Sequence, residues 1–227
     1  MAQLRLNRSD AMQRLQYDTL FFDLDGTLTN PARGIVNAVT HALAKRGIVV
    51  EDRDSLCRFI GPPLVDSFER FYGFSHAESL RAVADYREYF SETGLYENEV
   101  LPGAVELLSA LEAKGRKLVI ASSKPEPFVH RILDCFDLTA FFTAIHGATM
   151  DETRNQKDQV IAWALTHSGE IGAAVMVGDR CHDIVGARAN GLDSIGVLCG
   201  FGSEAELRDA GATYVVKDLQ ALKTLLG

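Results

Sequence analysis

Residues 20–28 read Leu-Phe-Phe-Asp-Leu-Asp-Gly-Thr-Leu, and the interpretation of the whole chain starts from this stretch. The apolar run from Thr19 to Phe22 has the length and the aromatic content of a buried strand. It ends in two carboxylates, Asp23 and Asp25, which are spaced two residues apart. Carboxylates at the end of a buried strand are costly unless they meet a cation or a reacting group. Because Asp and Gly are also common in turns, a turn without any chemistry is the alternative interpretation of this stretch alone.

The composition is that of a globular protein. The 227 residues are 47% hydrophobic and 24% charged, which is enough for one large domain or two small ones. No apolar run approaches the roughly 18 residues that span a membrane, and residues 1–16 lack the apolar centre of a signal peptide. We therefore expect a cytoplasmic protein in which residues 1–16 form a weakly ordered lead-in.

The net charge of −8 argues against a general affinity for nucleic acid or for anionic membranes. It is compatible with a small phosphorylated substrate, because a metal ion and a few local donors can invert the field inside a pocket. The expected partner is therefore a small phosphorylated metabolite, bound by a monomer or a homodimer. The four cysteines contain no Cys-x-x-Cys pair, which favours reduced thiols over a zinc site or a disulfide framework.

Two patterns of hydrophobicity divide the chain. Residues 30–98 show helical spacing of apolar residues without strand-like alternation. From Leu101 onward helices and apolar strands alternate, which is typical of right-handed βαβ units and a parallel sheet covered on both faces. We predict an α/β fold with a doubly wound, Rossmann-like core, formed by residues 17–29 and 99–227, and an all-helical domain inserted at residues 30–98. Later core strands are predicted at 117–121, about 142–146, 173–177, 194–198 and 214–216, and core helices at 104–114, 127–135, 158–167, 182–190, 204–210 and 219–226.

Polar groups follow several of the predicted core strands. Ser122-Ser123-Lys124-Pro125 comes after the strand at 117–121, Lys157 stands at a helix start, and Gly-Asp-Arg-Cys-His-Asp (178–183) comes after the strand at 173–177. Ligands of doubly wound sheets bind at the carboxyl ends of the strands. We therefore expect these groups to meet the two aspartates of the first strand end.

Together, such residues can supply the separate roles that phosphate-ester hydrolysis requires. One carboxylate can act as a covalent nucleophile, and another can protonate a leaving alkoxide and then activate water. Clustered carboxylates require a hard cation, and oxygen ligands together with a phosphate suit Mg²⁺. A hydroxyl and a lysine can hold the phosphate oxygens. The expected metal ligands are Asp23, Asp179 and the carbonyl of Asp25, with Asp183 in support, and the expected phosphate donors are Ser122 and Lys157. Taken singly, a turn serine, a helix-start lysine and a capping aspartate also have ordinary structural roles.

Four motifs, in order, resemble those of the haloacid dehalogenase-like hydrolases, and the resemblance extends from residue 17 to residue 227. The motifs are Phe-Asp-Leu-Asp-Gly-Thr-Leu (22–28), Ile-Ala-Ser-Ser-Lys-Pro (120–125), Lys157 and Val-Gly-Asp-Arg-Cys-His-Asp (177–183). The resemblance implies a phosphatase that forms an aspartyl-phosphate, with Asp23 as nucleophile and Asp25 as general acid and then base. It implies that the inserted helices form a mobile cap that closes over the substrate. The site residues that it implies are Asp23, Asp25, Asp179 and Asp183 for Mg²⁺, and Ser122, Ser123, Leu24 and Lys157 for phosphate.

Within this family the chain resembles the phosphoglycolate phosphatase branch. The stretches Phe-Ile-Gly-Pro-Pro-Leu (59–64) and Gly-Asp-Arg-x-His-Asp look most like those of nucleoside 5′-monophosphatases. The family's dehalogenases lack an acid at the position of Asp25, so the resemblance favours phosphate esters over halides. Ser123 stands where the family usually has Asn. The cap residues expected to contact the substrate are Arg33, Gly61 and Pro62, for which a solvated helix start and a rigid connector are the alternative roles.

Three functional hypotheses follow. The leading one is a Mg²⁺-dependent phosphatase of a small phosphate monoester, either 2-phosphoglycolate or a nucleoside 5′-monophosphate. The second is a sugar-phosphate phosphomutase that uses the same residues. The third is a catalytically silent binding protein on the same fold, and the intact pair of Asp23 and Asp25 together with Lys157 argues against it.

Overall fold

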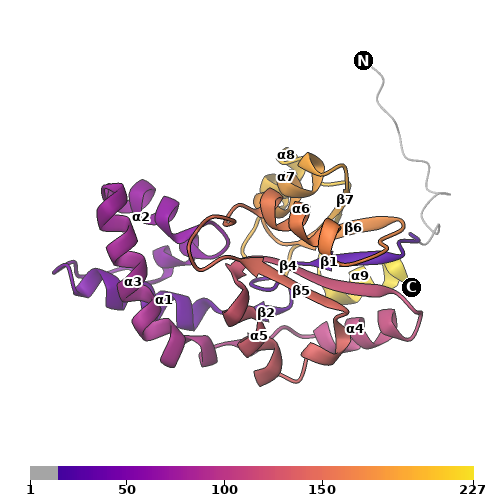
Figure 1. The fold of residues 1–227 in the computed structure, drawn as a ribbon, viewed down its shortest axis with the longest axis horizontal. Coiled ribbons are helices and arrows are strands. Elements are labelled where there is room, and N and C mark those ends of the chain that lie inside the picture. Colours follow the sequence, from indigo (N-terminus) through magenta and orange to yellow (C-terminus); the bar gives the residue numbers. More distant parts are fainter. Residues whose placement is uncertain (1–14) are drawn as a thin grey trace, which may run out of the picture.

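The computed structural model describes residues 15–227, and a six-stranded parallel sheet forms its centre (Figure 1). Its strands are β1 (Thr19–Phe22), β4 (Lys117–Pro125), β5 (Ala144–Ala148), β6 (Ala174–Gly178), β7 (Asp193–Val197) and β8 (Tyr214–Val216). They lie in the order β5-β4-β1-β6-β7-β8. The chain steps from β1 outward to β4 and β5 and then returns to β6 on the other side of β1. The strand order therefore reverses beside β1, where ligands of such sheets bind outside the carboxyl ends.

Helices cover both faces of the sheet. They are α4 (Ala104–Glu112), α5 (Glu126–Cys135), α6 (Lys157–His167), α7 (Cys181–Ala189), α8 (Glu204–Asp209) and α9 (Leu219–Leu226), with the short turn η3 (Thr139–Phe141). In Figure 1, α6 and α7 lie above the sheet, and α4, α5 and α9 lie below it. Phe21 packs in the core under α6 and α7, whereas its neighbours Leu20 and Phe22 belong to the core of the opposite face. Successive side chains of a strand point to opposite faces, so the continuous apolar run of β1 is buried on both.

A helical insertion separates the first strand from the rest of the sheet. Its elements are α1 (Ala32–Ala44), η1 (Asp54–Phe59), α2 (Leu64–Tyr72), α3 (His76–Glu92) and η2 (Gly94–Tyr96). Two short strands, β2 (Thr29–Asn30) and β3 (Glu99–Val100), pair antiparallel where the chain enters and leaves it. Aromatic rings form part of its core, since Phe59 lies 5.0 Å from Phe68 and 5.4 Å from Phe71, centroid to centroid. The predicted α/β architecture with an inserted helical cap is confirmed.

The observed elements differ from the predicted ones mainly at one strand end. The predicted strand at 117–121 continues to Pro125, so Ser122, Ser123 and Lys124 lie within β4 and not in a loop after it. The pairing of β4 with β5 shifts register between Ala121 and Pro125. Such an irregularity re-aims side chains near a site. Of the expected lead-in at residues 1–16, residues 1–14 lie outside the described residues.

Within residues 15–227 we find no candidate membrane-spanning helix, because no helix there is both long enough and apolar enough.

Candidate active site

Asp23 and Asp25 leave the end of β1 on a tight turn. The amide of Asp23 donates to the carbonyl of Val177 on β6 (2.9 Å), which extends the ladder by one residue. The amide of Leu28 then donates to the carbonyl of Leu24 (2.9 Å) and helps to close the turn. Residues two apart in an extended segment point to the same side, and both aspartates line one cavity. Their exposed fractions are only 4% and 8%.

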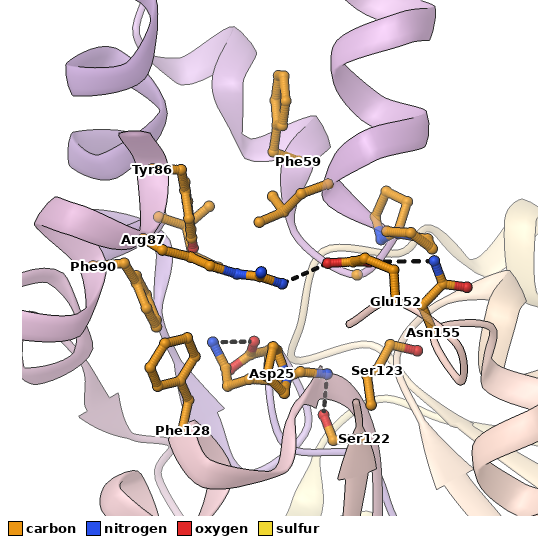
Figure 2. Close-up of a pocket in the computed structure, with 18 of the residues that line it drawn as sticks. Asp25, Phe59, Tyr86, Arg87, Phe90, Ser122, Ser123, Phe128, Glu152 and Asn155 are labelled. Atoms are coloured by element: carbon orange, nitrogen blue, oxygen red, sulfur yellow. Dashed lines mark hydrogen bonds and ion pairs between the residues drawn. The ribbon is translucent and has the colours of Figure 1, made fainter. Parts of the chain in front are cut away.

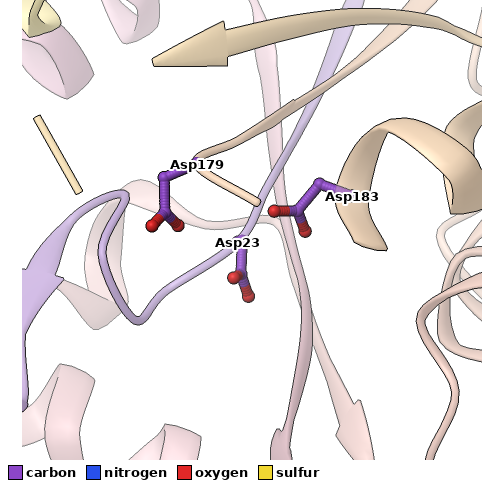
Figure 3. A group of neighbouring side chains, drawn as sticks. All are labelled: Asp23, Asp179 and Asp183. Carbon is purple, nitrogen blue, oxygen red and sulfur yellow. The ribbon is translucent and has the colours of Figure 1, made fainter. Parts of the chain in front are cut away.

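Three buried carboxylates converge at the carboxyl ends of β1 and β6 (Figure 3). One oxygen from each of Asp23, Asp179 and Asp183 lies within 4.8 Å of the others. Asp179 is held by the amide of Phe201, which donates to Oδ2 (2.8 Å), and by the hydroxyl of Thr27, which donates to Oδ1 (3.1 Å). Burial, together with the charges of Asp183 and Asp23, raises the pKa of Asp179 well above its usual range. Three crowded carboxylates of this kind favour the binding of a hard cation with oxygen ligands.

Lys157, at the start of α6, lies between two of these carboxylates. Its Nζ is 2.7 Å from Oδ1 of Asp23 and 2.8 Å from Oδ1 of Asp183, and it donates a hydrogen bond to the carbonyl of Ala121 (3.1 Å). Burial opposes the lysine charge, but the two carboxylates outweigh it and raise the pKa of Lys157. One lysine among three carboxylates leaves a deficit of positive charge, so this set of oxygen ligands fits a divalent cation.

A second buried ion pair joins Asp25 to Lys124 on β4 (Figure 2). Nζ of Lys124 is 2.8 Å from Oδ2 of Asp25 and 4.4 Å from the centre of the Phe90 ring. Burial raises the pKa of the Asp25 carboxyl, and Lys124 is the largest influence opposing that rise. The hydroxyl of Ser122 accepts a hydrogen bond from the amide of Lys124 (3.3 Å). A lysine from the irregular end of β4 thus reaches the second aspartate of the strand end.

A cavity of about 710 Å³, counting the open space at its mouth, lies between the helical cap and these strand ends. Asp23, Asp25, Ser122 and Ser123 form its polar end. The apolar walls contain Ile35, Phe59, Leu64, Tyr86, Phe90 and Phe128. The cavity therefore joins the carboxylates to an aromatic chamber built mainly by the cap.

Arg87 of the cap crosses this chamber and contacts the core (Figure 2). Its Nη2 lies 2.5 Å from Oε1 of Glu152, and its Nη1 donates to the carbonyl of Met150 (3.0 Å). Asn155 donates to the other oxygen of Glu152 (3.3 Å). The cap is thus tied to the loop after β5 by a charged contact at the cavity wall.

The structure brings together most of the residues that the sequence singled out. Asp23, Asp25, Ser122 and Ser123 line the cavity, as do Gly61 and Pro62 of the cap, and Lys157, Asp179 and Asp183 surround Asp23. The side chain of Leu24 is buried in the hydrophobic core. Arg33 is not brought to the cavity, because its side chain is 81% exposed and faces Glu97 at 3.5 Å.

Several cavity residues had no predicted role. Lys124 lies in the motif at residues 120–125, so the sequence indicated that it is near the site. Its ion pair with Asp25 was not predicted. Tyr86 and Phe90 are at helical spacing, which by itself predicts a core residue. Arg87 and Glu152 are 65 residues apart, and no local pattern connects them.

Comparisons with known proteins agree with this geometry. Residues 20–197 match the family model described as haloacid dehalogenase-like hydrolase. A protein of Pseudomonas aeruginosa named 5′-nucleotidase is 46% identical over 93% of this chain and 96% of its own. The tyrosine-protein kinase PtkA of Mycobacterium tuberculosis is 39% identical over 87% of this chain and 67% of its own. The crystal structure of a predicted phosphatase from Clostridium acetobutylicum superposes with a TM-score of 0.89, at 44% identity, and covers 91% of this chain and 96% of that one.

Proposed function

The chain belongs to the haloacid dehalogenase-like hydrolases, and from this membership we propose that it is a Mg²⁺-dependent phosphatase that cleaves a small phosphate monoester through an aspartyl-phosphate. The observation that carries the proposal is the convergence of Asp23, Asp179 and Asp183 within 4.8 Å, with Asp25 on the same cavity. Clustered carboxylates beside the polar end of the cavity are suited to phosphoryl transfer assisted by a hard cation.

In the first half-reaction, a carboxylate oxygen of Asp23 attacks the phosphorus, so that an Asp23–phosphorus bond forms and the ester bond breaks. The protonated carboxyl of Asp25 gives its proton to the leaving alkoxide, which departs as the alcohol. In the second half, the Asp25 carboxylate takes a proton from water, the water oxygen bonds to phosphorus, and phosphate leaves Asp23. Ser122 and Lys157 hold the non-bridging oxygens.

Mg²⁺ would be held by Asp23, Asp179 and the carbonyl of Asp25, with Asp183 in support, and would neutralise charge on the phosphoryl oxygens. Lys124 holds the ionised form of Asp25 in place through the ion pair at 2.8 Å, and this is the form that takes the proton from water in the second half-reaction. The cap covers both aspartates, and their low exposure supports a reaction from which bulk water is excluded.

The lining of the cavity favours a nucleoside as the leaving group over glycolate. Among the described residues that line it, the two cationic side chains are both paired, Lys124 with Asp25 and Arg87 with Glu152. The carboxylate of 2-phosphoglycolate would have to displace one of these partners. An uncharged nucleoside would instead face aromatic walls and the polar edge of Glu152 and Asn155.

The test is phosphate release with Mg²⁺ across a panel of 2-phosphoglycolate, nucleoside 5′-monophosphates, sugar phosphates and phosphotyrosine. We expect nucleoside 5′-monophosphates to lead by about 100-fold in kcat/KM, or about 2.7 kcal/mol of differential transition-state binding. If phosphotyrosine leads instead, the preferred leaving group is a phenol and the nucleoside assignment is wrong. Isomerisation of a sugar phosphate without phosphate release would favour the phosphomutase.

Two variants test the mechanism on the same panel. Asp23→Asn should abolish turnover, and full activity in this variant would refute the nucleophile. Asp25→Asn should still form the aspartyl-phosphate from an ester with a good leaving group, seen as a burst, but should hydrolyse it slowly because no base activates water. Equal loss of both half-reactions would contradict the double role of Asp25. Exhaustive chelation should stop turnover, and Mg²⁺ should restore it.

A further inference from the structure

Arg180 follows Asp179 directly, but its side chain leaves the carboxylates and reaches the cap. Its backbone amide donates to Oδ2 of Asp183 (3.0 Å), so its main chain belongs to the carboxylate loop, residues 178–183. Its guanidinium Nη1 donates to the carbonyl of Ile60, 120 residues away in the cap. A single residue therefore touches both the carboxylate loop and the cap.

Glu206 of α8 fixes the direction of this arginine. Its Oε1 accepts from Nε of Arg180 (2.9 Å) and from the backbone amide of Cys181 (2.9 Å). The side chain of Arg180 is only 16% exposed. Because Nε is held by the core, the far end of the guanidinium is left to face the cap. Charge-assisted hydrogen bonds of this kind fix geometry as well as supply energy.

The contacted part of the cap is the cap loop, residues 59–64, which also forms a wall of the cavity. Phe59, Gly61, Pro62 and Leu64 line the cavity, and Ile60 is fully buried. Gly61 has a φ of +107°, and a Cβ atom there would lie 3.2 Å from Cγ and 3.3 Å from Nη1 of Arg180. The cap loop thus lies closely against the arginine side chain, in a backbone conformation that favours glycine.

We propose that Arg180 is a positioning residue that docks the cap loop on the carboxylate loop, so that the wall of the leaving-group chamber is complete only when the two loops are joined. Other polar contacts also join the cap to the core. Arg87 with Glu152 and Gln156 with Asp66 end on the segment between β5 and α6, and Arg131 of α5 donates to the carbonyl of Ser91 in α3 (2.7 Å). Arg180 differs from these contacts because it starts beside a carboxylate of the reaction centre. The proposal rests on the proposed function only in taking the chamber as the site of the leaving group.

The decisive variant is Arg180→Met, which keeps the aliphatic stem and removes every donor. Its matched control is Arg208→Met, which removes an exposed arginine from an ion pair with Glu204 on the same helix as Glu206. The first readout is amide hydrogen exchange of residues 56–64 without metal or substrate. We expect exchange of this segment to rise about tenfold in Arg180→Met and to stay at the wild-type rate in Arg208→Met. Wild-type exchange in Arg180→Met would overturn the proposal.

The second readout is a split between substrates. For a nucleoside 5′-monophosphate, Arg180→Met should lower kcat/KM at least about tenfold, mainly by raising KM, because the chamber wall is displaced. Acetyl phosphate has no group that reaches the aromatic wall, so its loss should be several times smaller. Equal losses with the two substrates would contradict a role in positioning the wall. If the wild-type protein cleaves neither substrate, the proposed function fails, and hydrogen exchange alone still decides the docking.

A variant on the cap side keeps the test valid if Arg180→Met does not fold. Gly61→Ala places a methyl group against the arginine and should produce the same exchange pattern. Gly47→Ala is its control, because Gly47 also has a positive φ (+70°) and lies in the cap, but nothing lies within 4 Å of its Cβ position. Similar exchange of residues 56–64 in the two glycine variants would refute the close docking of Arg180.

Discussion

Gly26, in the turn after β1, lies directly against the carboxylate of Asp179. Its φ is +84°, and a Cβ atom there would lie 2.3 Å from Oδ2 of Asp179. Two independent constraints therefore act on this position: the backbone conformation favours glycine, and the neighbouring carboxylate leaves no room for a side chain. Gly115 shares only the first constraint, with a φ of +70° and no atom within 4 Å of its Cβ position.

These two glycines provide a matched pair of variants. Gly115→Ala should cost about 1–2 kcal/mol of unfolding free energy, the price of a left-handed alanine, and leave kcat near the wild-type value. Gly26→Ala should cost more and also lower kcat at least about 100-fold, because the Asp179 carboxylate must move away from the added methyl group. Urea denaturation and steady-state kinetics measure both. Retention of wild-type kcat in Gly26→Ala would show that the position of Asp179 does not matter for turnover.

Single residues differ in how far the sequence could place them. The sequence predicted that three side chains meet, those of Asp23, Lys157 and Asp179, because the carboxyl ends of parallel strands lie at one edge of the sheet. Arg33 could not, because a residue at a helix start faces solvent or a cavity according to the rotation of the helix, which the sequence pattern leaves open. The pairing of Arg87 with Glu152 depends on how the cap lies on the core. The sequence pattern does not predict that arrangement, because the two residues are 65 positions apart.

Among the secondary-structure elements, β1 and β6 together determine the charge of the site. Each delivers a carboxylate to the same edge, and α7 adds Asp183. Without a cation, the burial and mutual repulsion of these groups cost free energy, as the raised pKa of Asp179 indicates. The elements thus hold a destabilised arrangement that a bound cation would relieve, which is common where function competes with stability.

Asp179→Asn should separate these effects. An asparagine can accept from the amide of Phe201 and donate to the hydroxyl of Thr27, so the local hydrogen bonds persist while one charge is lost. We expect the variant without metal to melt at or above the wild-type Tm. Mg²⁺ should raise the wild-type Tm by several degrees, since binding at 100 times Kd adds about 2.7 kcal/mol, and should leave the variant unchanged. A Mg²⁺ shift of wild-type size in Asp179→Asn would argue against this ligand.

The strand β5 carries a titrating group unconnected with the proposed chemistry. His146 is 9% exposed, and its Nε2 lies 3.0 Å from the hydroxyl of Ser168. Burial lowers the pKa of His146, against an opposing influence of Glu126. The ring is therefore neutral in the fold at a pH at which the unfolded chain, with an ordinary pKa near 6.5, binds a proton.

It follows that acid should unfold the protein partly through this residue. Below about pH 6.5 the unfolded state binds a proton at His146 that the native state does not bind. The unfolding free energy should therefore decrease as the pH is lowered, by at most about 1.4 kcal/mol per pH unit for one group. His146→Asn should have a shallower slope between pH 7 and 5. The control is His76→Asn, at a side chain that is 74% exposed. Equal slopes in the wild type and His146→Asn would exclude His146 as a source of the pH dependence.

The strands show where element prediction stops. Apolar runs located β1 and β6 to within a residue, because burial on both faces leaves a continuous apolar pattern. The apolar pattern of the next strand ends at Ala121, because Ser122 to Lys124 are polar, so the strand was predicted to end there. The observed β4 continues to Pro125. Polar residues can remain in a strand when its end opens on a cavity, and only the tertiary fold reveals that cavity.

At the scale of the whole molecule, the cap and the core meet over one cavity and are joined by charged contacts. The helical spacing of residues 30–98 predicted the cap itself, but the surface by which it contacts the core depends on residues from both parts. Arg87 and Glu152 form one such contact, with side chains 22% and 23% exposed. Their pairing joins the cap to the loop after β5, so we expect its strength to be visible in substrate affinity and not only in stability.

A double-mutant cycle with Arg87→Met and Glu152→Gln measures that coupling. A partly exposed ion pair contributes about 0.2–1 kcal/mol, so we expect a coupling energy of about this size in kcat/KM for the preferred substrate, decreasing at high salt. Arg87→Met should lose more than Glu152→Gln, because it also removes the hydrogen bond to the carbonyl of Met150. Lys45→Met, which removes an ion pair within the cap, is the control and should leave kcat/KM near the wild-type value. Additive single losses would mean that the pair does not couple the cap to the core. The position of the cap would then depend on its other contacts, among them Arg180 with Ile60 and Arg131 with Ser91, and on apolar packing.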